Sequence, residues 1–271
     1  MSPELRRVRG AAVTTFAVYV CGTLLALAPA VPLASALEHA VGDHPDGSAA
    51  LYAPGGVWLM ETIAELGAAW AMLAKVTMVT MLLSLLLGPL LQMVWLAALL
   101  RRRRLAESLA EGARRYFSAI GVSLLLSPIL ALALLLLVAV PGLVALAVKS
   151  TPSDRTHDLA LLLACIPALQ IAALWATWHD LARASLARGG GALSAVIRGG
   201  LATFTRGAMP AYLMWLALGT TIGLAAHLLG GVLDVGGAIA SFGVLLVTQL
   251  LGLTKTFIRA RWLAGALERV R

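Results

Sequence analysis

The sequence predicts an all-α membrane protein with six transmembrane helices, arranged as three tandem helical hairpins in parallel orientation. Three observations lead to this prediction: the composition, six uncharged runs, and basic residues that recur at alternate ends of these runs. Apolar residues make up 60% of the chain and charged residues only 13%. A water-soluble domain carries about a quarter charged residues. A lipid bilayer is therefore the expected surrounding of most of this chain.

Six stretches contain no Asp, Glu, Lys or Arg, and each reaches the roughly 20 residues that a helix needs to cross about 30 Å of hydrocarbon. They are residues 10–37, 76–100, 116–148, 159–179, 207–233 and 235–254. Because no water satisfies the backbone inside a bilayer, open-ended spanning segments are helices. We expect a single transmembrane domain over residues 1–271, with spans near 11–36, 73–99, 117–147, 159–179, 208–229 and 236–257.

The net charge of +8 is distributed unevenly along this pattern. If the N-terminus lies inside, 18 of the 21 Lys and Arg residues fall on the inner side, in segments 6–9, 101–115, 183–206 and 255–271. Such a positive-inside bias predicts an inner-membrane protein of a bacterial envelope with both termini in the cytoplasm. The same distribution explains the positive charge by anionic lipid headgroups, without nucleic acid as a partner.

The first uncharged run permits a second interpretation. Its basic start, its apolar middle and the sequence Ala34-Ser35-Ala36 together resemble a secretory signal with a cleavage site. We favour a retained first helix, bent near Pro29 and Pro32, because the uncharged run of 28 residues (10 to 37) is longer than a signal core.

Glutamines inside three of the apolar runs suggest an internal repeat. Gln92, Gln170 and Gln249 lie 78 and 79 residues apart (92 to 170, 170 to 249), and each is followed by basic residues. A Gly-x4-Phe segment also precedes the third and the fifth span, at residues 112–117 and 199–204. Around a pseudo-threefold axis the three amides would meet at a similar depth and contact one another or a substrate. The favoured alternative is a hydrogen bond from each amide to a neighbouring helix backbone.

Basic amphipathic helices are expected on the cytoplasmic side. Arg103–Glu107 and Glu111–Arg115 are spaced i,i+4, which predicts a short helix lying against the membrane. The residues predicted to contact a partner or lipid headgroups are Arg101, Arg102, Arg103, Arg104, Arg114 and Arg115. At the end of the fourth span, His179, Asp180 and Arg183 are interpreted as an interfacial hydrogen-bonded cluster.

Acidic residues gather on the predicted outer side. Glu61 and Glu65 share one face of an amphipathic helix, where paired carboxylates can serve acid–base chemistry or attract cations. We favour a solvated face of an interfacial helix. The preceding loop holds His39 and His44 among carboxylates, which are metal-ligand types. The loop has no fixed ligand spacing, so no metal site and no cofactor is expected.

The known reaction motifs that we searched for are missing from the sequence. It contains no Gly-x-Ser-x-Gly, no Gly-x4-Gly-Lys-Ser/Thr and no His-Glu-x-x-His. The favoured hypothesis is a non-enzymatic membrane protein, a permease-like or assembly subunit of a transport or envelope complex. One alternative is a stand-alone transporter of small molecules or lipids. A second alternative is a membrane enzyme that acts on lipid headgroups through Glu61, Glu65 and the loop histidines.

Overall fold

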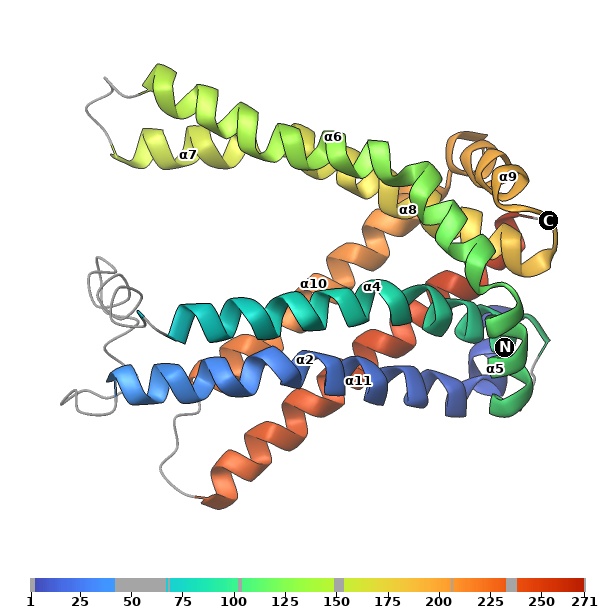
Figure 1. Ribbon diagram of the computed structural model, residues 1–271, viewed down its shortest axis with the longest axis horizontal. Helices are drawn as coiled ribbons and strands as arrows, with labels where there is room; N and C mark the ends of the chain where they lie inside the picture. The colour runs from blue at the N-terminus through green and yellow to red at the C-terminus, as the bar shows by residue number, and fades with distance from the viewer. Residues whose placement is uncertain are drawn as a thin grey trace. The chain divides into compact units, whose positions relative to one another are not determined.

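The protein is all-helical over the residues that the computed structural model describes, which are 3–41, 67, 69–101, 104–148, 154–205, 207–232 and 238–270 (Figure 1). These ranges contain no strand and only short turns between helices. The helices are α1 (Pro3–Gly10), α2 (Ala12–Val41), α4 (Ala69–Arg101), α5 (Leu105–Arg114), α6 (Tyr116–Val148), α7 (Asp154–Ala164), α8 (Ile166–Arg188), α9 (Ala192–Thr205), α10 (Ala208–Val232) and α11 (Ala238–Arg269).

Six segments are long and apolar enough to cross a bilayer, which confirms a multi-pass membrane protein at this level. They are Ala12–Ala36, Trp70–Arg101, Tyr116–Ala147, Leu159–Arg188, Ala208–Ala226 and Phe242–Arg269. The fourth segment comprises α7 and α8, with a turn at Cys165 before Pro167, whose ring nitrogen cannot donate to the preceding turn.

The fourth and sixth spans continue beyond the ends expected from the sequence, residues 179 and 257. The expected end of the fourth span lies directly before Asp180, and that of the sixth lies two residues before Arg259. In the structure, Asp180 and Arg259 lie inside α8 and α11, and their side chains form an ion pair across the two helices. The ion pair partly offsets the cost of burying the two charges.

The chain divides into two compact units, and each is considered by itself. Unit 2 comprises residues Ala17–Gly88, which include most of α2 and the first part of α4. Its α2 segment contains Pro29 and Pro32 within one continuous helix. Many of its large apolar side chains are exposed, including Leu24, Val31, Met81 and Leu85. Exposed apolar side chains on spanning helices are suited to contact with lipid.

Unit 1 comprises Met1–Phe16 and Pro89–Arg271, and its core lies where α4, α8 and α11 approach their C-terminal ends. The fully buried side chains there include Met93, Leu96, Leu99, Leu181, Leu186, Leu263 and Leu267. Further along the spans of this unit, large apolar side chains such as Val138, Leu146 and Leu162 are exposed. The packed core of unit 1 is therefore concentrated at the end that carries the basic residues.

Two glycines let short helices pack closely on the ends of spans. A Cβ atom on Gly199 of α9 would lie 2.6 Å from the backbone nitrogen of Ala182 in α8. A Cβ atom on Gly112 of α5 would lie 2.9 Å from the backbone nitrogen of Val94 in α4. No side chain fits at such distances. These glycines begin the two Gly-x4-Phe segments of the sequence, so the segments share a packing role.

Neighbouring spans of unit 1 pack side by side, α6 against α8 and α10 against α11 (Figure 1).

Within α6, Pro128 has no N–H to donate to the carbonyl of Leu124 one turn earlier. The hydroxyl of Ser127 donates to that carbonyl instead, at 2.8 Å. The hydroxyl therefore satisfies a backbone oxygen that would otherwise lack a donor in the bilayer.

Candidate functional site

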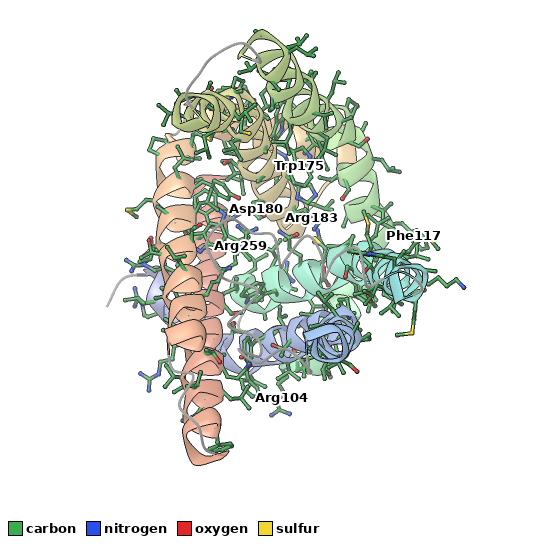
Figure 2. All side chains as sticks on the ribbon, turned by 90° about the vertical axis from the view of Figure 1, so that its left-hand side faces the viewer. Arg104, Phe117, Trp175, Asp180, Arg183 and Arg259 are labelled. Atoms are coloured by element: carbon green, nitrogen blue, oxygen red, sulfur yellow. The ribbon has the colours of Figure 1, made fainter. Side chains whose placement is uncertain are left out.

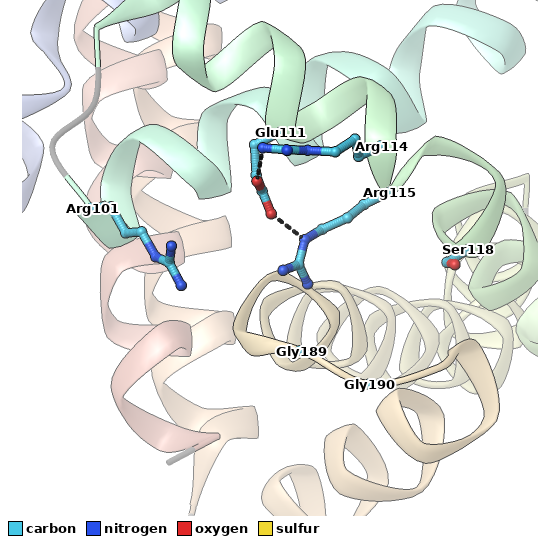
Figure 3. Close-up of a pocket in the computed structure, with 7 residues that line it drawn as sticks. All are labelled: Arg101, Glu111, Arg114, Arg115, Ser118, Gly189 and Gly190. Carbon is cyan, nitrogen blue, oxygen red and sulfur yellow. Dashed lines mark hydrogen bonds and ion pairs between the residues drawn. The ribbon is translucent and has the colours of Figure 1, made fainter.

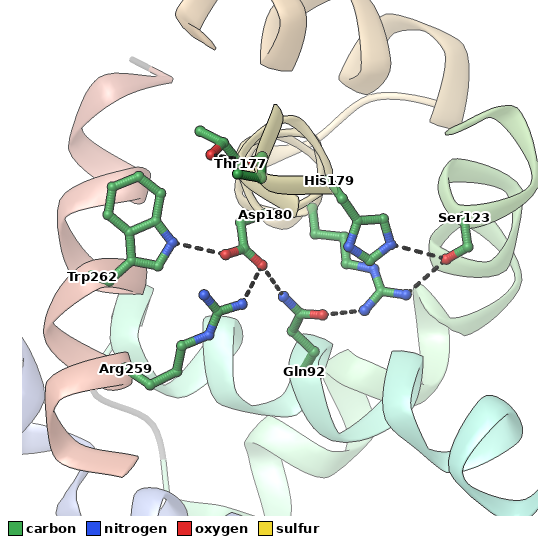
Figure 4. Close-up of polar contacts among 9 residues, drawn as sticks. Gln92, Ser123, Thr177, His179, Asp180, Arg259 and Trp262 are labelled. Carbon is green, nitrogen blue, oxygen red and sulfur yellow. Dashed lines mark hydrogen bonds and ion pairs between the residues drawn. The ribbon is translucent and has the colours of Figure 1, made fainter. Parts of the chain in front are cut away.

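One buried carboxylate joins three helices of unit 1. Asp180 on α8 is only 2% exposed. Its Oδ1 accepts hydrogen bonds from Gln92 Nε2 on α4 at 2.9 Å and from Arg259 Nη2 on α11 at 2.5 Å (Figure 4). Its Oδ2 accepts one from Trp262 Nε1 on α11 at 2.8 Å. Asp180 therefore holds the ends of α4, α8 and α11 together.

A second buried group extends these contacts to α6. Arg183 on α8 is 5% exposed and donates to Gln92 Oε1 and, at 2.7 Å, to Ser123 Oγ on α6. Ser123 Oγ also lies 3.2 Å from His179 Nε2, and the ring of Trp175 stacks on His179. We call the whole set the Asp180 cluster: Gln92, Ser123, His179, Asp180, Arg183, Arg259 and Trp262 (Figures 2 and 4).

The Asp180 cluster contains two guanidinium groups and one carboxylate. The guanidinium of Arg259 also lies 4.4 Å from the ring centre of Trp215, a distance typical of a cation–π contact. Arg183 Nε and Arg259 Nη1 are buried, and neither has a hydrogen-bond partner among the described residues. With a neutral imidazole, the cluster keeps one positive charge and two unused donors. The cluster thus holds α4, α6, α8 and α11 together. Its two remaining guanidinium donors can still bind a hydrogen-bond acceptor.

The pairing of Ser123 with His179 differs from that of a hydrolytic triad. In a triad, a carboxylate accepts a hydrogen bond from the second imidazole nitrogen and orients the base. The carboxylate oxygens of Asp180 instead accept from Gln92, Arg259 and Trp262. The geometry of the cluster therefore favours helix bracing or ligand binding over nucleophilic attack. In the part of the chain that the structure describes, no group of His, Cys, Asp and Glu is arranged to hold a metal ion.

Only one of the three predicted glutamines belongs to the Asp180 cluster. Gln92 is partly buried in it, whereas the side chains of Gln170 and Gln249 are exposed. Gln170 precedes Asp180 by ten residues on α8, and Gln249 precedes Arg259 by ten residues on α11. Ten helical residues span about 15 Å along the axis. Gln170 and Gln249 therefore lie about three helical turns before the residues of the Asp180 cluster on their own helices.

A series of tryptophans recurs at a similar spacing in unit 1. Three tryptophans each donate an indole N–H across to another segment: Trp95 to Thr15 Oγ1 at 3.0 Å, Trp178 to the Val196 carbonyl at 2.7 Å, and Trp262 to Asp180. They lie 83 and 84 residues apart (95 to 178, 178 to 262), five residues more than the glutamine spacings.

The tryptophan series relates Gln92 to Arg259 and not to the other two glutamines. Gln92 and Arg259 both lie three residues before a tryptophan of this series. Both also donate to the same oxygen, Asp180 Oδ1. The tryptophan spacing is visible in the sequence, and all three indoles donate to a different segment of unit 1.

Basic residues also line an open pocket at the same end of unit 1. We call it the arginine pocket, and its lining residues are Arg101, Glu111, Arg114, Arg115, Ser118, Gly189 and Gly190, around a volume of about 660 Å³ (Figure 3). They come from the end of α4, the junction between α5 and α6, and the turn that joins α8 to α9. Gly189 and Gly190 have φ angles of 132° and 105°, which favour glycine.

Glu111 organises two of the arginines in this pocket. Its carboxylate accepts from Arg115 Nε at 2.7 Å and from Arg114 Nη2 at 2.7 Å. The hydrogen bond from Arg115 is the main reason that the pKa of Glu111 is lowered to about 2. Arg115 also donates to the carbonyl of Leu186 and so ties the start of α6 to α8. The predicted i,i+4 pair between Glu111 and Arg115 is confirmed.

The other predicted contact residues are distributed as follows. Arg104 precedes α5 and is exposed, away from Asp180 and Arg183 (Figure 2). Arg102 and Arg103 lie outside the described residues. Glu61 and Glu65 lie outside them as well, so their assignment remains a prediction.

Comparison of the chain with protein-family models, with curated proteins and with solved structures gives no match. The class that fold and sequence define is a multi-pass α-helical membrane protein.

Proposed function

We propose that this chain is a non-enzymatic inner-membrane protein with both termini in the cytoplasm, serving as a permease-like or assembly subunit of a transport or envelope complex. The observation that carries this proposal is the firm attachment of the short amphipathic helices to the ends of the spans. A helix attached in this way passes a displacement on to the span that it contacts. A cytoplasmic partner that docks on such helices therefore acts on the membrane part directly.

The attachment uses several polar contacts within unit 1. An ion pair joins Arg7 of α1 to Glu268 of α11. The guanidinium of Arg188, at the end of α8, donates twice to the carbonyl of Leu267, at 2.9 and 2.6 Å. The indole of Trp178 on α8 also donates to the Val196 carbonyl of α9. Together these contacts connect α1, α8, α9 and α11 within unit 1. Such an arrangement supports a platform for a partner.

The best candidate for the docking surface is α9. Its buried face carries Gly199 and Gly200, which pack against α8. Its opposite face exposes Leu193, Ile197 and Phe204, which recur at the i, i+4 and i+11 positions of one helix face. Helix-in-groove recognition uses such a face, which enters an apolar groove of the partner. We propose that α9 acts as a coupling helix in this sense.

The close contacts of α5 and α9 also support the predicted repeat of three hairpins in parallel orientation. Gly112 contacts Val94 at the end of one span, and Gly199 contacts Ala182 at the end of another. The two contacts are equivalent in type and lie at similar distances after their spans. We propose a unit of short basic inner helix, spanning helix, outer loop and returning spanning helix, present three times in the same orientation.

The coupling role is tested by replacing the exposed face of α9. The variant Leu193→Ala, Ile197→Ala, Phe204→Ala keeps helix-forming residues and removes the apolar stripe. The matched control removes three exposed apolar residues of α6, as Leu134→Ala, Leu143→Ala, Leu146→Ala. Proteins that co-purify from native membranes in mild detergent are then quantified by mass spectrometry.

The expected result is at least a roughly tenfold loss of one stoichiometric partner from the α9 variant only, because a few anchor residues contribute most of the binding energy at interfaces. An unchanged set of partners would contradict the docking role of α9. If the α9 variant alone leaves the membrane fraction, the helix is an interfacial anchor instead.

A second candidate function is a stand-alone transporter of a small anion. It is favoured by the surplus positive charge of the Asp180 cluster, because charged groups in membrane spans commonly mark pathways of ions or substrates. Arg259→Lys retains the charge but loses the planar fork. Anion uptake by the purified protein in liposomes, with Arg259→Lys and Gln170→Leu compared side by side, tests it. Uptake that is equal to that of protein-free liposomes excludes this function for the anions assayed.

A further inference from the structure

We propose that the arginine pocket binds the phosphate of an anionic membrane lipid and prefers a phosphate monoester headgroup. This inference requires only that the chain spans a membrane, so it does not depend on a partner protein. It assigns a binding site to residues that the bracing role of the Asp180 cluster does not use.

The position of the pocket favours a lipid over a soluble ligand. Arg101 is the last residue of one span, Ser118 lies in the first turn of the next, and Gly189 directly follows the end of a third. Three spans therefore begin or end around the pocket. These helix ends lie beyond the apolar runs, where arginine side chains can reach lipid headgroups, so a lipid phosphate is a ligand within reach of the pocket.

The charges of the pocket match a phosphate monoester. Arg101, Arg114 and Arg115 contribute three positive charges, and Glu111 contributes one negative charge. Since the pKa of Glu111 is lowered to about 2, its carboxylate stays charged at neutral pH. The remaining charge of +2 matches a phosphate monoester, which carries about −1.5 to −2 at pH 7. A phosphodiester lipid such as phosphatidylglycerol carries only one negative charge on its phosphate.

The donors needed for a phosphate are also present. Within the described part of the chain, Arg101 makes no hydrogen bond or ion pair, and its side chain points into the pocket (Figure 3). Most of the Arg114 side chain is exposed beyond its contact with Glu111. Guanidinium groups bind phosphate oxygens through two parallel hydrogen bonds. The hydroxyl of Ser118 adds a neutral donor on the opposite side of the pocket.

An apolar surface continues from the pocket along α6, as an acyl chain requires. Ser118, Leu125 and Leu132 follow one another at seven-residue intervals and so lie on one face of the helix. Leu125 and Leu132 are both about half exposed. Phe117, beside Ser118, is 82% exposed and points outward (Figure 2). A lipid with its phosphate in the pocket can therefore place its chains along α6.

The test compares lipids that differ in their phosphate. The purified full-length protein in mild detergent is titrated with short-chain phosphatidic acid, a monoester, and with short-chain phosphatidylglycerol, a diester. Inorganic phosphate is the soluble arm, and bound species are counted by native mass spectrometry. We expect roughly tenfold tighter binding of the monoester lipid and no displacement of it by inorganic phosphate at equal concentration.

Two variants with equal charge loss locate the site. Arg101→Gln with Arg114→Gln removes two exposed pocket arginines, and Arg6→Gln with Arg9→Gln removes two exposed arginines of α1. Each lost cation weakens binding to anionic lipid by roughly fivefold in both variants. Only the pocket variant is expected to lose the preference for the monoester. Glu111→Gln should tighten binding of both lipids, because the competing carboxylate is gone.

Three results would overturn the proposal. The first is equal binding of the two lipids by the unmodified protein. The second is a pocket variant that keeps the preference for the monoester. The third is full displacement of the lipid by inorganic phosphate, which would identify a soluble phosphate as the ligand. None of these results depends on whether α9 docks a partner.

Discussion

Removal of the Asp180 carboxylate tests the central packing argument most directly. Asp180→Ala deletes the acceptor of three hydrogen bonds, those from Gln92, Arg259 and Trp262. It also leaves the guanidinium groups of Arg183 and Arg259 close together without a counter-ion. We therefore expect a large destabilisation of unit 1, with the chain still inserted in the membrane because the apolar spans are unchanged.

The magnitude follows from the burial of the pair. Breaking a buried ion pair by removing one partner costs about 3–5 kcal/mol. For domains of 150–250 residues, about 1 kcal/mol shifts the melting temperature by roughly 2–4 °C. Asp180→Ala is therefore expected to lower the melting temperature by roughly 10 °C. Asp180→Asn keeps one acceptor oxygen, so its loss should be about half as large.

The assay is thermal unfolding of the purified protein in mild detergent, followed by tryptophan fluorescence. Gln170→Leu is the control, because Gln170 is an exposed amide on the same helix and lies about 15 Å from Asp180 along the helix. The double variant Asp180→Leu with Arg259→Met removes both charges of the pair. It should recover at least half of the loss, since an apolar replacement of a buried ion pair is often neutral.

The reasoning is refuted if Asp180→Ala melts within about 2 °C of the unmodified protein while the control behaves normally. It is also refuted if the double variant is less stable than Asp180→Ala. In that case the stability of unit 1 would come from apolar packing alone, and the polar contacts would be incidental.

Three further outcomes are expected. Gly199→Leu should separate α9 from α8 and lower the free energy of unfolding by about 1–3 kcal/mol, as overpacking does. Gly191→Ala is the control and should be neutral, because no atom lies within 4 Å of a Cβ at this position. Thermal unfolding measures both variants. Because the folded pKa of Glu111 is lowered to about 2, its contribution to stability is complete above pH 4.5 and is lost as the pH falls toward 2; acid titration of unfolding should show this loss in the unmodified protein and not in Glu111→Gln. Trp95→Phe removes the indole bond to Thr15 and should cost about 0.5–1.5 kcal/mol in the same unfolding assay.

The spans were predictable from the sequence because uncharged runs of sufficient length have few alternatives in a bilayer. Their ends were less predictable. A charged residue marks the end of a span only when its charge reaches water or headgroups. Asp180 and Arg259 instead pair with each other inside unit 1, and α8 and α11 continue beyond them. Such a pairing between residues 79 positions apart leaves no local trace in the sequence.

The candidate sites were predictable in part, for a similar reason. The pair of Glu111 and Arg115 depends only on helical spacing, and the structure contains it as expected. The bond between Gln92 and Asp180 depends on which helices are neighbours. Spacing alone suggested a common depth for three glutamines, and the structure adds a second series, the tryptophans, whose indoles all donate to a different segment. Choosing between two such series requires knowledge of which side chains cross between helices.

Pro128 has a consequence for how α6 responds to force. Beside it, one hydroxyl donor takes the place of the main-chain donor that proline lacks. A side-chain donor can follow its acceptor when the axis bends, whereas a main-chain donor is fixed by the helix geometry. The third span can therefore change its bend angle at Pro128 while the Leu124 carbonyl keeps a hydrogen-bond donor. A displacement at one end of α6 can be taken up by this bend before it reaches the other end.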